Sequence, residues 1–357
     1  MSHNLQLYCK VKRRILQWLP EARITRVRNL ALLVTGLCEE RGIHMSEIVG
    51  EWPMPGREVS LVNRLRRFLS NEAVDVDAWY RPLARQILAV FEDQQVCLVI
   101  DTTKVGFDHR LLVIGLVYRQ RTLPLAWSVH PGSRGHTTVA EQKALFQRVA
   151  ALLPPGADVV VLGDSEFQHV PLLRWFCRRN WHFIVRQQGR IKVYVAGQGW
   201  QKLNSFELTP GETRTIGWVR LTEKHKMGWF WLVLHWDEDE DEPWYLIADQ
   251  PGQRRIIRLY GKRMWIEEMF GDEKDNGFEL EATHIRHAAR LKRLVLGVSI
   301  AFVYFITLGS WVVKRGFRRL IDKKSRRDKS YFRLGMDWFN QHRRLGHPLR
   351  LHFRPYT

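Results

Sequence analysis

The stretches VCLVIDTTK (residues 96–104) and DVVVLGDSEF (residues 158–167) decide the fold of this chain. Each contains a short apolar run that is typical of a buried β-strand. Asp101 ends the first run, and Asp164 stands just past the end of the second. Either aspartate alone is equally typical of a turn or a helix cap. Because α/β sheets carry their chemistry at the carboxyl ends of strands, the pair predicts a functional site.

A third acid lies in the stretch YGKRMWIEEMFGDEK, residues 260–274. The spacing Y-x2-R-x3-E-x6-K is formed by Tyr260, Arg263, Glu267 and Lys274. At about 100° per residue, these positions fall within roughly 60° of a helix, so we expect them on one face. A carboxylate among three phosphate-seeking groups suggests a metal ligand that works on a nucleic-acid backbone. The alternative is a solvated helix face with an Arg263–Glu267 pair.

Three carboxylates from separate elements are a suitable ligand set for divalent cations. Two strand-end aspartates, Asp101 and Asp164, followed by the helical Glu267, can hold two Mg2+ (or Mn2+) ions that clamp the attacking and leaving oxygens of a phosphodiester. The neighbouring acids Glu166 and Glu268 are poorer candidates. Glu268 is turned by about 100° from Glu267 on a helix, and we expect Glu166 to cap the helix that follows it.

Together these motifs resemble the DDE transposases of the bacterial insertion sequence 4 family, whose hallmark is the Y-x2-R-x3-E-x6-K signature. The segments IDTT, GDSEF, HFIVR and WYLIA precede the signature in the order of that family. The similarity extends over roughly residues 90–315. It implies an enzyme that binds the inverted repeats at transposon ends, cleaves the DNA and joins the ends to target DNA. It also implies a hairpin intermediate and a homodimer in the synaptic complex.

The resemblance assigns roles to individual residues. The implied catalytic residues and metal ligands are Asp101, Asp164 and Glu267. The implied phosphate contacts near the cleaved bond are Tyr260, Arg263 and Lys274. Trp244, at the start of the strand WYLIA, corresponds to a tryptophan that stacks on a base flipped out during hairpin formation. A place in the core is the alternative for Trp244, as it is for most of the 15 tryptophans.

The expected fold is α/β. From residue 93 the chain predicts three strands, a helix, a strand, a helix and a strand, which is the order of an RNase H-like fold. Five segments follow from this pattern: a helical N-terminal domain (1–92), the first part of the catalytic core (93–187), a β-rich insertion (188–243), the second part of the core (244–315) and a basic C-terminal segment (316–357).

The N-terminal domain is expected to bind DNA through a cationic helix flank. The helix around residues 60–70 places Arg64, Arg66 and Arg67 beside apolar residues, which suits a reader of DNA ends. A packing domain with solvated arginines is the alternative. Residues 314–329 add nine Lys or Arg and form a second candidate for binding the DNA backbone.

Composition indicates the class of binding partner and the cellular compartment. The net charge of +19 predicts a polyanionic partner. Four scattered cysteines without a C-x-x-C pair favour reduced thiols and hence a cytosol. The resemblance implies that this is a bacterial cytoplasm, where the protein would associate with the nucleoid. Residues 294–313 lack charge over 20 positions, which passes a simple test for a membrane span. Their small residues favour a buried core helix, so we expect no membrane partner.

Two other functions remain open from the residues alone. An RNase H-like nuclease without strand-joining activity also needs clustered acids and metal ions. A domesticated DNA-binding protein that has lost catalysis would keep the fold and the positive charge. The Tyr-Arg-Lys spacing around Glu267 argues against the first, and the presence of all three acids argues against the second.

Overall fold

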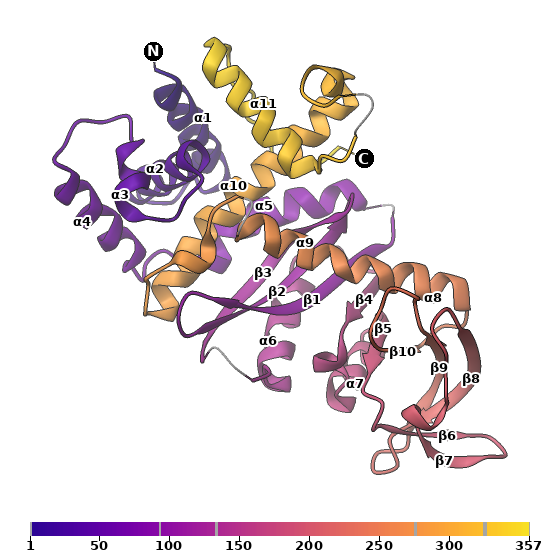
Figure 1. Ribbon diagram of the computed structural model, residues 1–357. Helices are drawn as coiled ribbons and strands as arrows, with labels where there is room; N and C mark the ends of the chain where they lie inside the picture. Colours follow the sequence, from indigo (N-terminus) through magenta and orange to yellow (C-terminus); the bar gives the residue numbers. More distant parts are fainter. Residues whose placement is uncertain (1, 93, 133–134, 275–276, 324–326, 357) are drawn as a thin grey trace.

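The computed structural model describes residues 2–92, 94–132, 135–274, 277–323 and 327–356. Helices at the N-terminus, a large central sheet and C-terminal helices follow one another along the chain (Figure 1). The strands are β1 (Val96–Val105), β2 (His109–Tyr118), β3 (Arg121–Pro131), β4 (Val159–Gly163), β5 (His182–Gln187), β6 (Lys192–Val195), β7 (Gly199–Lys202), β8 (Thr213–Leu221), β9 (Met227–His235) and β10 (Trp244–Ala248).

All these strands belong to one ten-stranded sheet with the order β3-β2-β1-β4-β5-β10-β9-β8-β6-β7. β1, β2 and β3 form an antiparallel meander, whereas β1 pairs with β4, and β4 with β5, in parallel. Parallel neighbours need crossover connections, and the helices α6 (Val139–Ala150) and α7 (Val170–Arg178) provide them. This arrangement is the predicted RNase H-like core, and the α/β fold class is confirmed.

The segment predicted as a β-rich insertion extends the same sheet. β10 pairs with β5 on one side and with β9 on the other, and β8, β6 and β7 continue outward. The strand β7 was not predicted, because GWQK is short and lacks a run of β-formers. The β-rich character predicted for residues 188–243 is confirmed by β6, β7, β8 and β9. The boundaries assigned to the five segments stay predictions.

The N-terminal helices are α1 (His3–Trp18), α2 (Ile24–Glu40), α3 (Met45–Gly50), α4 (Glu58–Leu69) and α5 (Val76–Leu88). Three of them, α2, α4 and α5, pack against α10 (Ala288–Lys314), and α1 and α3 pack on α2. α10 also contacts β3 and α11 (Tyr331–Leu345). Within the described part of the chain, α10 is the one helix long and apolar enough to span a membrane. Of its most apolar stretch of 18 residues, 94% is buried inside the protein. The charge-free run is therefore a core helix, as its small residues predicted.

The basic C-terminal segment folds back on the protein. Arg318 pairs with Asp322 at 2.7 Å, and Lys329 pairs with Asp337 at 2.8 Å. Part of the charge that was predicted to bind DNA is thus neutralised internally. Residues 324–326 of this basic stretch lie outside the described residues.

The signature does not form one continuous helix, and that expectation was wrong. α8 (Gln253–Tyr260) ends at the tyrosine, a 3-10 turn spans Gly261–Arg263, and α9 (Met264–Glu273) carries the glutamate. Lys274 lies beyond α9 at its C-cap. Glycine weakens a helix, and Gly261 stands at the start of the 3-10 turn. Figure 1 shows α8 and α9 lying across the sheet, where they contact β1, β3 and β5.

Two glycines set the close approach of α10 and α11. A methyl group at Gly309 would overlap the carbonyl oxygen of Tyr331, and one at Gly335 would overlap the carbonyl oxygen of Phe305. Both neighbours are backbone atoms that cannot rotate away. Gly335→Ala should therefore lower the free energy of unfolding by about 1–3 kcal/mol, as expected for overpacking, measured by chemical denaturation.

Gly50→Ala is the matched control. Gly50 ends α3 and has open space around the position of a Cβ, so this change should leave stability unchanged or slightly raised. Equal stability of the two variants would show that the helix pair tolerates a wider separation.

Candidate active site

The parallel pairing of β1 and β4 brings two aspartates together. Ile100 of β1 stands opposite Gly163 of β4, so the next residues, Asp101 and Asp164, emerge side by side at the carboxyl ends of the strands. Asp101 lies in β1 and Asp164 directly follows β4, which are interior strands, the third and fourth in the sheet order, and α9 contacts β1. The structure therefore brings together two residues that the sequence placed at separate strand ends.

Asp101 is buried and held by two hydrogen bonds. Its Oδ1 accepts from the backbone N–H of Thr102 at 2.7 Å, and its Oδ2 accepts from Arg263 Nη1 at 3.1 Å. Burial, with the nearby charge of Asp164, raises the pKa of Asp101 to about 7, although Arg263 opposes the shift. A buried carboxyl poised near neutral pH is typical of a functional site.

Asp164 caps the short 3-10 turn Ser165–Phe167. Its Oδ1 accepts from the backbone N–H of Glu166 at 2.9 Å. Burial raises the pKa of Asp164, and the hydrogen bond from the Glu166 backbone and the charge of Arg263 oppose this rise. One carboxylate oxygen is thus fixed by the backbone.

Arg263 joins the third acid to this pair. It donates to Asp101 Oδ2 at 3.1 Å and to Glu267 Oε1 at 2.6 Å. The Arg263 side chain is only 12% exposed, whereas that of Glu267 is 45% exposed. Burial favours loss of the Arg263 proton, but Tyr260, Asp101 and Glu267 outweigh this effect and raise its pKa. Arg263 therefore neutralises the acids instead of facing outward, as a pure phosphate contact would.

The donor set fits divalent cations. Carboxylate oxygens are the ligands that Mg2+ prefers, and the buried pair of like charges at Asp101 and Asp164 is an arrangement that positive charge stabilises. Arg263 already supplies such a charge between Asp101 and Glu267. Within the described ranges, no three His, Cys, Asp or Glu side chains converge as a ready metal cluster. Asp101, Asp164 and Glu267 are the residues that would hold the ions.

Glu166 is a buried carboxylate whose position the sequence did not predict. Its Oε1 accepts from Thr102 Oγ1 at 3.2 Å and from the backbone N–H of Thr137 at 2.8 Å. His136 lies 3.5 Å from its other oxygen. Glu166 does not cap α7 as we expected, since the N-cap of α7 is His169 and makes no side-chain cap hydrogen bond. Glu166 instead ties the loop before α6 to the end of β1, next to Asp101.

Tyr260 and Trp244 lie in the core next to the site. Tyr260 is 2% exposed and Trp244 is 9% exposed. Their rings meet edge to face, with centroids 5.0 Å apart. Burial raises the pKa of Tyr260. β10 lies between β5 and β9 and is buried on both faces, so neither ring is on the surface of the protein alone.

Lys274 and Glu268 lie apart from the acid cluster. Lys274 pairs with Glu281, and Glu268 pairs with Arg121 of β3 at 3.0 Å. Asp272 also contacts Arg121, and burial raises its pKa to about 6. The structure therefore brings Asp101, Asp164, Arg263 and Glu267 together and leaves Lys274 outside.

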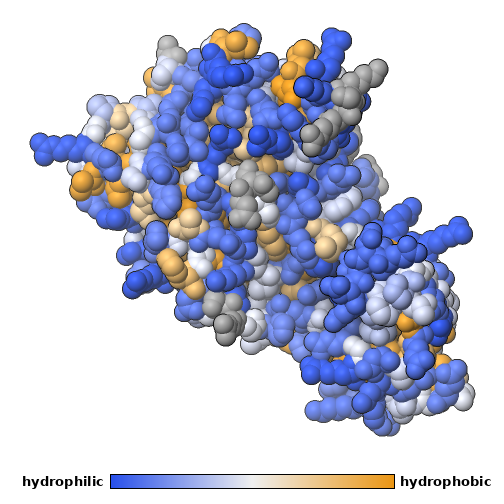
Figure 2. Space-filling model, in the orientation of Figure 1, coloured by the Kyte–Doolittle hydropathy of each residue, from blue (hydrophilic) through white to orange (hydrophobic). Residues whose placement is uncertain are grey.

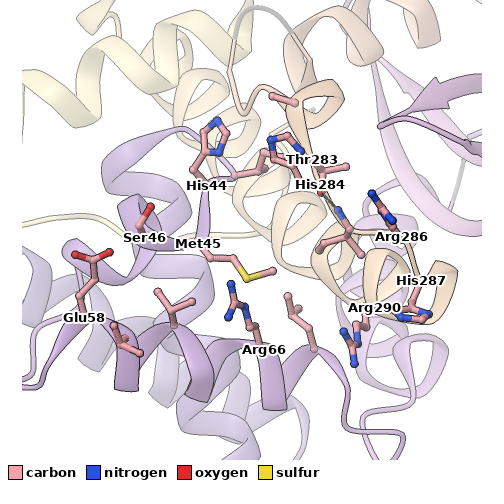
Figure 3. A pocket seen from close by; sticks show the side chains of 16 residues that line it. His44, Met45, Ser46, Glu58, Arg66, Thr283, His284, Arg286, His287 and Arg290 are labelled. Carbon is pink, nitrogen blue, oxygen red and sulfur yellow. Dashed lines mark hydrogen bonds between the residues drawn. The ribbon is translucent and has the colours of Figure 1, made fainter.

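The three arginines of α4 have different surroundings. Arg64 donates to Asn29 Oδ1 of α2 at 2.8 Å, and Arg67 donates to the carbonyl oxygen of Asn63 in its own helix at 3.3 Å. Arg66 lies in a groove of about 620 Å3 between α3, α4 and the segment before α10 (Figure 3). The other cationic or titratable basic residues of this groove are His44, His284, Arg286, His287 and Arg290, with Glu58 as the acid.

Comparison with known proteins adds a family to this geometry. Residues 95–305 match the model of a family described as "Transposase DDE domain". No curated protein resembles the chain closely enough to count as a relative. One similar solved structure is titled "Cryo-EM structure of piggyBac transposase synaptic complex with hairpin DNA (SNHP)", with a TM-score of 0.43 and 11% sequence identity, covering 98% of this chain and 83% of that chain.

The raised pKa of Asp101 predicts a dependence of stability on pH. The folded protein keeps this proton up to about pH 7, whereas the unfolded chain, with the ordinary value of 3.8, releases it earlier. The Asp101 contribution therefore lowers stability as the pH rises from about 4 to about 7. Without divalent ions, Asp101→Asn should be more stable than the parent at pH 8, on the order of 2 kcal/mol, because about 1.4 kcal/mol per pKa unit is partly offset by the weaker Arg263 contact.

Thermal unfolding with and without Mg2+ or Mn2+ measures this effect. The ions should stabilise the parent and narrow its difference from Asp101→Asn. A parent protein that is more stable than Asp101→Asn at pH 8 in chelator would contradict a net destabilisation by the buried Asp101 carboxylate.

Proposed function

Since the matched residues 95–305 make up more than half of the chain, the protein belongs to the transposase DDE domain family, and we propose that it cuts DNA at transposon ends and joins those ends to target DNA. The observation that carries this proposal is the buried pair Asp101 and Asp164, linked to Glu267 through Arg263. The Y-x2-R-x3-E-x6-K signature supports membership of the insertion sequence 4 family.

The proposed chemistry is metal-dependent hydrolysis followed by transesterification. Two Mg2+ (or Mn2+) ions, held by Asp101, Asp164 and Glu267, would supply activation of the attacking oxygen and stabilisation of the leaving oxygen. The protein itself positions the reacting groups and stabilises charge, because phosphoryl transfer needs little covalent catalysis by the protein. Glu166 and Thr102 hold the end of β1, and thus Asp101, in place. Arg263 lies within this cluster, where its planar fork suits two oxygens of one phosphate.

The family resemblance carried by Trp244 and Tyr260 supports a hairpin route. Their rings contact each other at the start of the signature. We propose that a flipped base reaches Trp244 when the DNA end is bound. Because Trp244 is buried in the protein alone, this role requires local rearrangement around the start of β10. Stacking contributes about 1–3 kcal/mol and offsets the cost of flipping the base.

The proposed partners are transposon-end DNA and target DNA, with a homodimer in the synaptic complex. The net charge of +19 supports a polyanionic partner. The groove around Arg66 supports an end-binding role for the N-terminal helices, because it combines arginines from α4 and from the start of α10. We propose a bacterial cytoplasm as the setting, with the protein associated with the nucleoid, because that is where the DNA partner would lie.

Removal of each acid tests the reaction. Asp101→Ala, Asp164→Ala and Glu267→Ala should each lower cleavage by orders of magnitude in Mg2+, because each removes a ligand. Affinity for the end should change little, since it rests on other phosphate contacts. The substrate is a labelled duplex that carries the inverted repeats flanking the coding region. Glu268→Ala, which loses only the contact with Arg121, is the control and should cleave normally.

The products of the same assay separate the alternatives. A transposase gives joined product with target DNA, and a hairpin end runs at double length on a denaturing gel. Cleavage without joining would identify a nuclease, and binding without cleavage would identify a DNA-binding protein without catalysis. Near-normal cleavage by any one of the three acid variants would remove that residue from the metal site.

The groove predicts which arginine of α4 touches DNA. Arg66→Ala and Arg290→Ala should each lower the slope of log affinity against log salt by about one unit, because each loses one phosphate contact. Arg67→Ala removes an equal charge from the same helix, but Arg67 lies outside the groove, so its slope should be unchanged. Equal slopes for all three variants would show that the groove is not the DNA contact.

A further inference from the structure

The strands β6, β7, β8 and β9 have two chemically different faces. One face is apolar and buried, and it includes Val193, Val219 and Phe230. Residues alternate between faces along a strand, so Tyr194, Arg220 and the tryptophans of β8 and β9 lie on the opposite face. Cross-strand pairing of Tyr194 with Arg220, and of Trp218 with Trp231, confirms this register.

The opposite face carries a row of aromatic rings, which we name the aromatic face: Tyr194, Trp200, Trp218, Trp229 and Trp231. The ring of Tyr194 lies 5.6 Å from Trp200 and 6.4 Å from Trp229, and Trp218 lies 5.4 Å from Trp231. Trp218 is 43% exposed and Trp229 is 44% exposed. Large aromatic side chains are thus open to solvent in a sheet whose other side is well packed.

Positive charge accompanies these rings. The Arg220 guanidinium lies over Trp229, 4.9 Å from the ring centroid. Lys192 and Lys202 stand opposite each other on β6 and β7. Each is two residues from an aromatic residue of its strand, so both lie on the same side of the sheet as the aromatic face. The acid Glu223 pairs with Lys192 at 2.7 Å. Figure 2 shows a mostly hydrophilic surface with paler patches over these strands, at lower right.

Acidic residues concentrate at the other end of the β8–β9 pair. The run 237–242 follows β9, whereas Trp229 lies near the start of that strand. The turn before β9 carries exposed Lys224 and Lys226. The aromatic face is therefore basic at the end where Trp229 and Arg220 lie, which suits a polyanion with stackable groups.

We propose that the aromatic face binds single-stranded DNA, with bases stacked on Trp229 and Trp218 and phosphates near Arg220 and the lysines. Every base has a π-face, so such a surface accepts unpaired strands of any sequence. A duplex keeps its bases stacked on each other and cannot use the rings. The identity of the ligand as DNA rests on the proposed function, which produces unpaired or distorted DNA at the cleaved end.

The aromatic face is continuous with the site. Trp231 pairs with Ala248, and His235 pairs with Trp244, so these tryptophans occupy the same side of neighbouring strands. Trp244 contacts Tyr260 at the end of α8, and Thr215 of β8 donates to Gln253 of α8 at 2.8 Å. The aromatic face therefore lies on the same side of the sheet as α8 and Tyr260.

The test measures binding of a labelled 20-nucleotide oligo-dT and of a random 20-base-pair duplex to the full-length protein. Chelator is present, so that cleavage plays no part. Trp229→Ala should weaken oligo-dT binding about tenfold, within the range of measured base–aromatic stacking, and leave duplex binding within about twofold. Trp229→Phe should retain most of the affinity, whereas Trp229→Leu should not, because a leucine keeps apolar area but not a ring.

Arg220 and Arg179 provide a matched pair. Arg179 lies over Trp175 at 4.4 Å on α7, away from the aromatic face. Arg220→Ala should weaken oligo-dT binding, and Arg179→Ala should not. Thermal unfolding of each variant identifies loss of fold, and Trp218→Ala supplies a second, independent probe of the face.

Three outcomes would overturn the proposal. The first is unchanged oligo-dT binding in Trp229→Ala and Trp218→Ala. The second is an equal loss of affinity for oligo-dT and for duplex, as a general loss of charge would predict. The third is a lower oligomeric mass of these variants with unchanged oligo-dT binding, which would assign the face to contact between copies of the chain. If the parent protein does not cleave transposon ends but the tryptophan variants lose affinity for oligo-dT and not for duplex, this inference holds and the proposed function is wrong.

Discussion

Compensation of buried like charges is the constraint on which the centre of this protein depends. Parallel pairing of β1 and β4 forces Asp101 and Asp164 together where water is largely excluded. Burial and repulsion both favour the protonated acids, and a single guanidinium, that of Arg263, opposes them. Arg263 reaches the aspartates from the 3-10 turn between α8 and α9, while Glu267 meets it from the first turns of α9. The 3-10 turn between the two helices and the order of the strands thus both bring the Arg263 guanidinium close to the buried carboxylates.

Much of the core was predictable from sequence because its signals are local. Apolar runs of strand length and a strand-end aspartate each act over a few residues. The start of α6 shows a signal of the same local kind: Thr138 accepts from the Glu141 backbone and donates its own backbone N–H to the Glu141 carboxylate, which forms a capping box. The element order then implied the β1–β4 pairing, and hence the adjacency of Asp101 and Asp164.

The remaining features depend on contacts that no local pattern encodes. The spacing of the signature fits an ideal helix, but a 3-10 turn at Gly261–Arg263 interrupts that helix. Lys274 lies beyond the end of α9, where it pairs with Glu281 outside the cluster. The role of Glu166 depends on Thr102 and Thr137, which lie far from it in sequence. Arg64, Arg66 and Arg67 look alike in sequence, and only the packing of α4 against α2 and α3 separates them. The aromatic face also arises from strand register, since its five aromatic residues are scattered over four strands.

The continuity of the sheet also limits how the protein can be shortened or rearranged. β10 carries the sequence WYLIA, and all five residues are buried between β5 and β9. Excision of residues 188–243 would turn β10 into an unprotected edge strand, with free backbone donors and acceptors beside an apolar surface. Such an edge invites pairing with other chains and aggregation. The outer strands therefore cover the edge of β10. We expect a chain without them to be less soluble, although it would keep every catalytic residue.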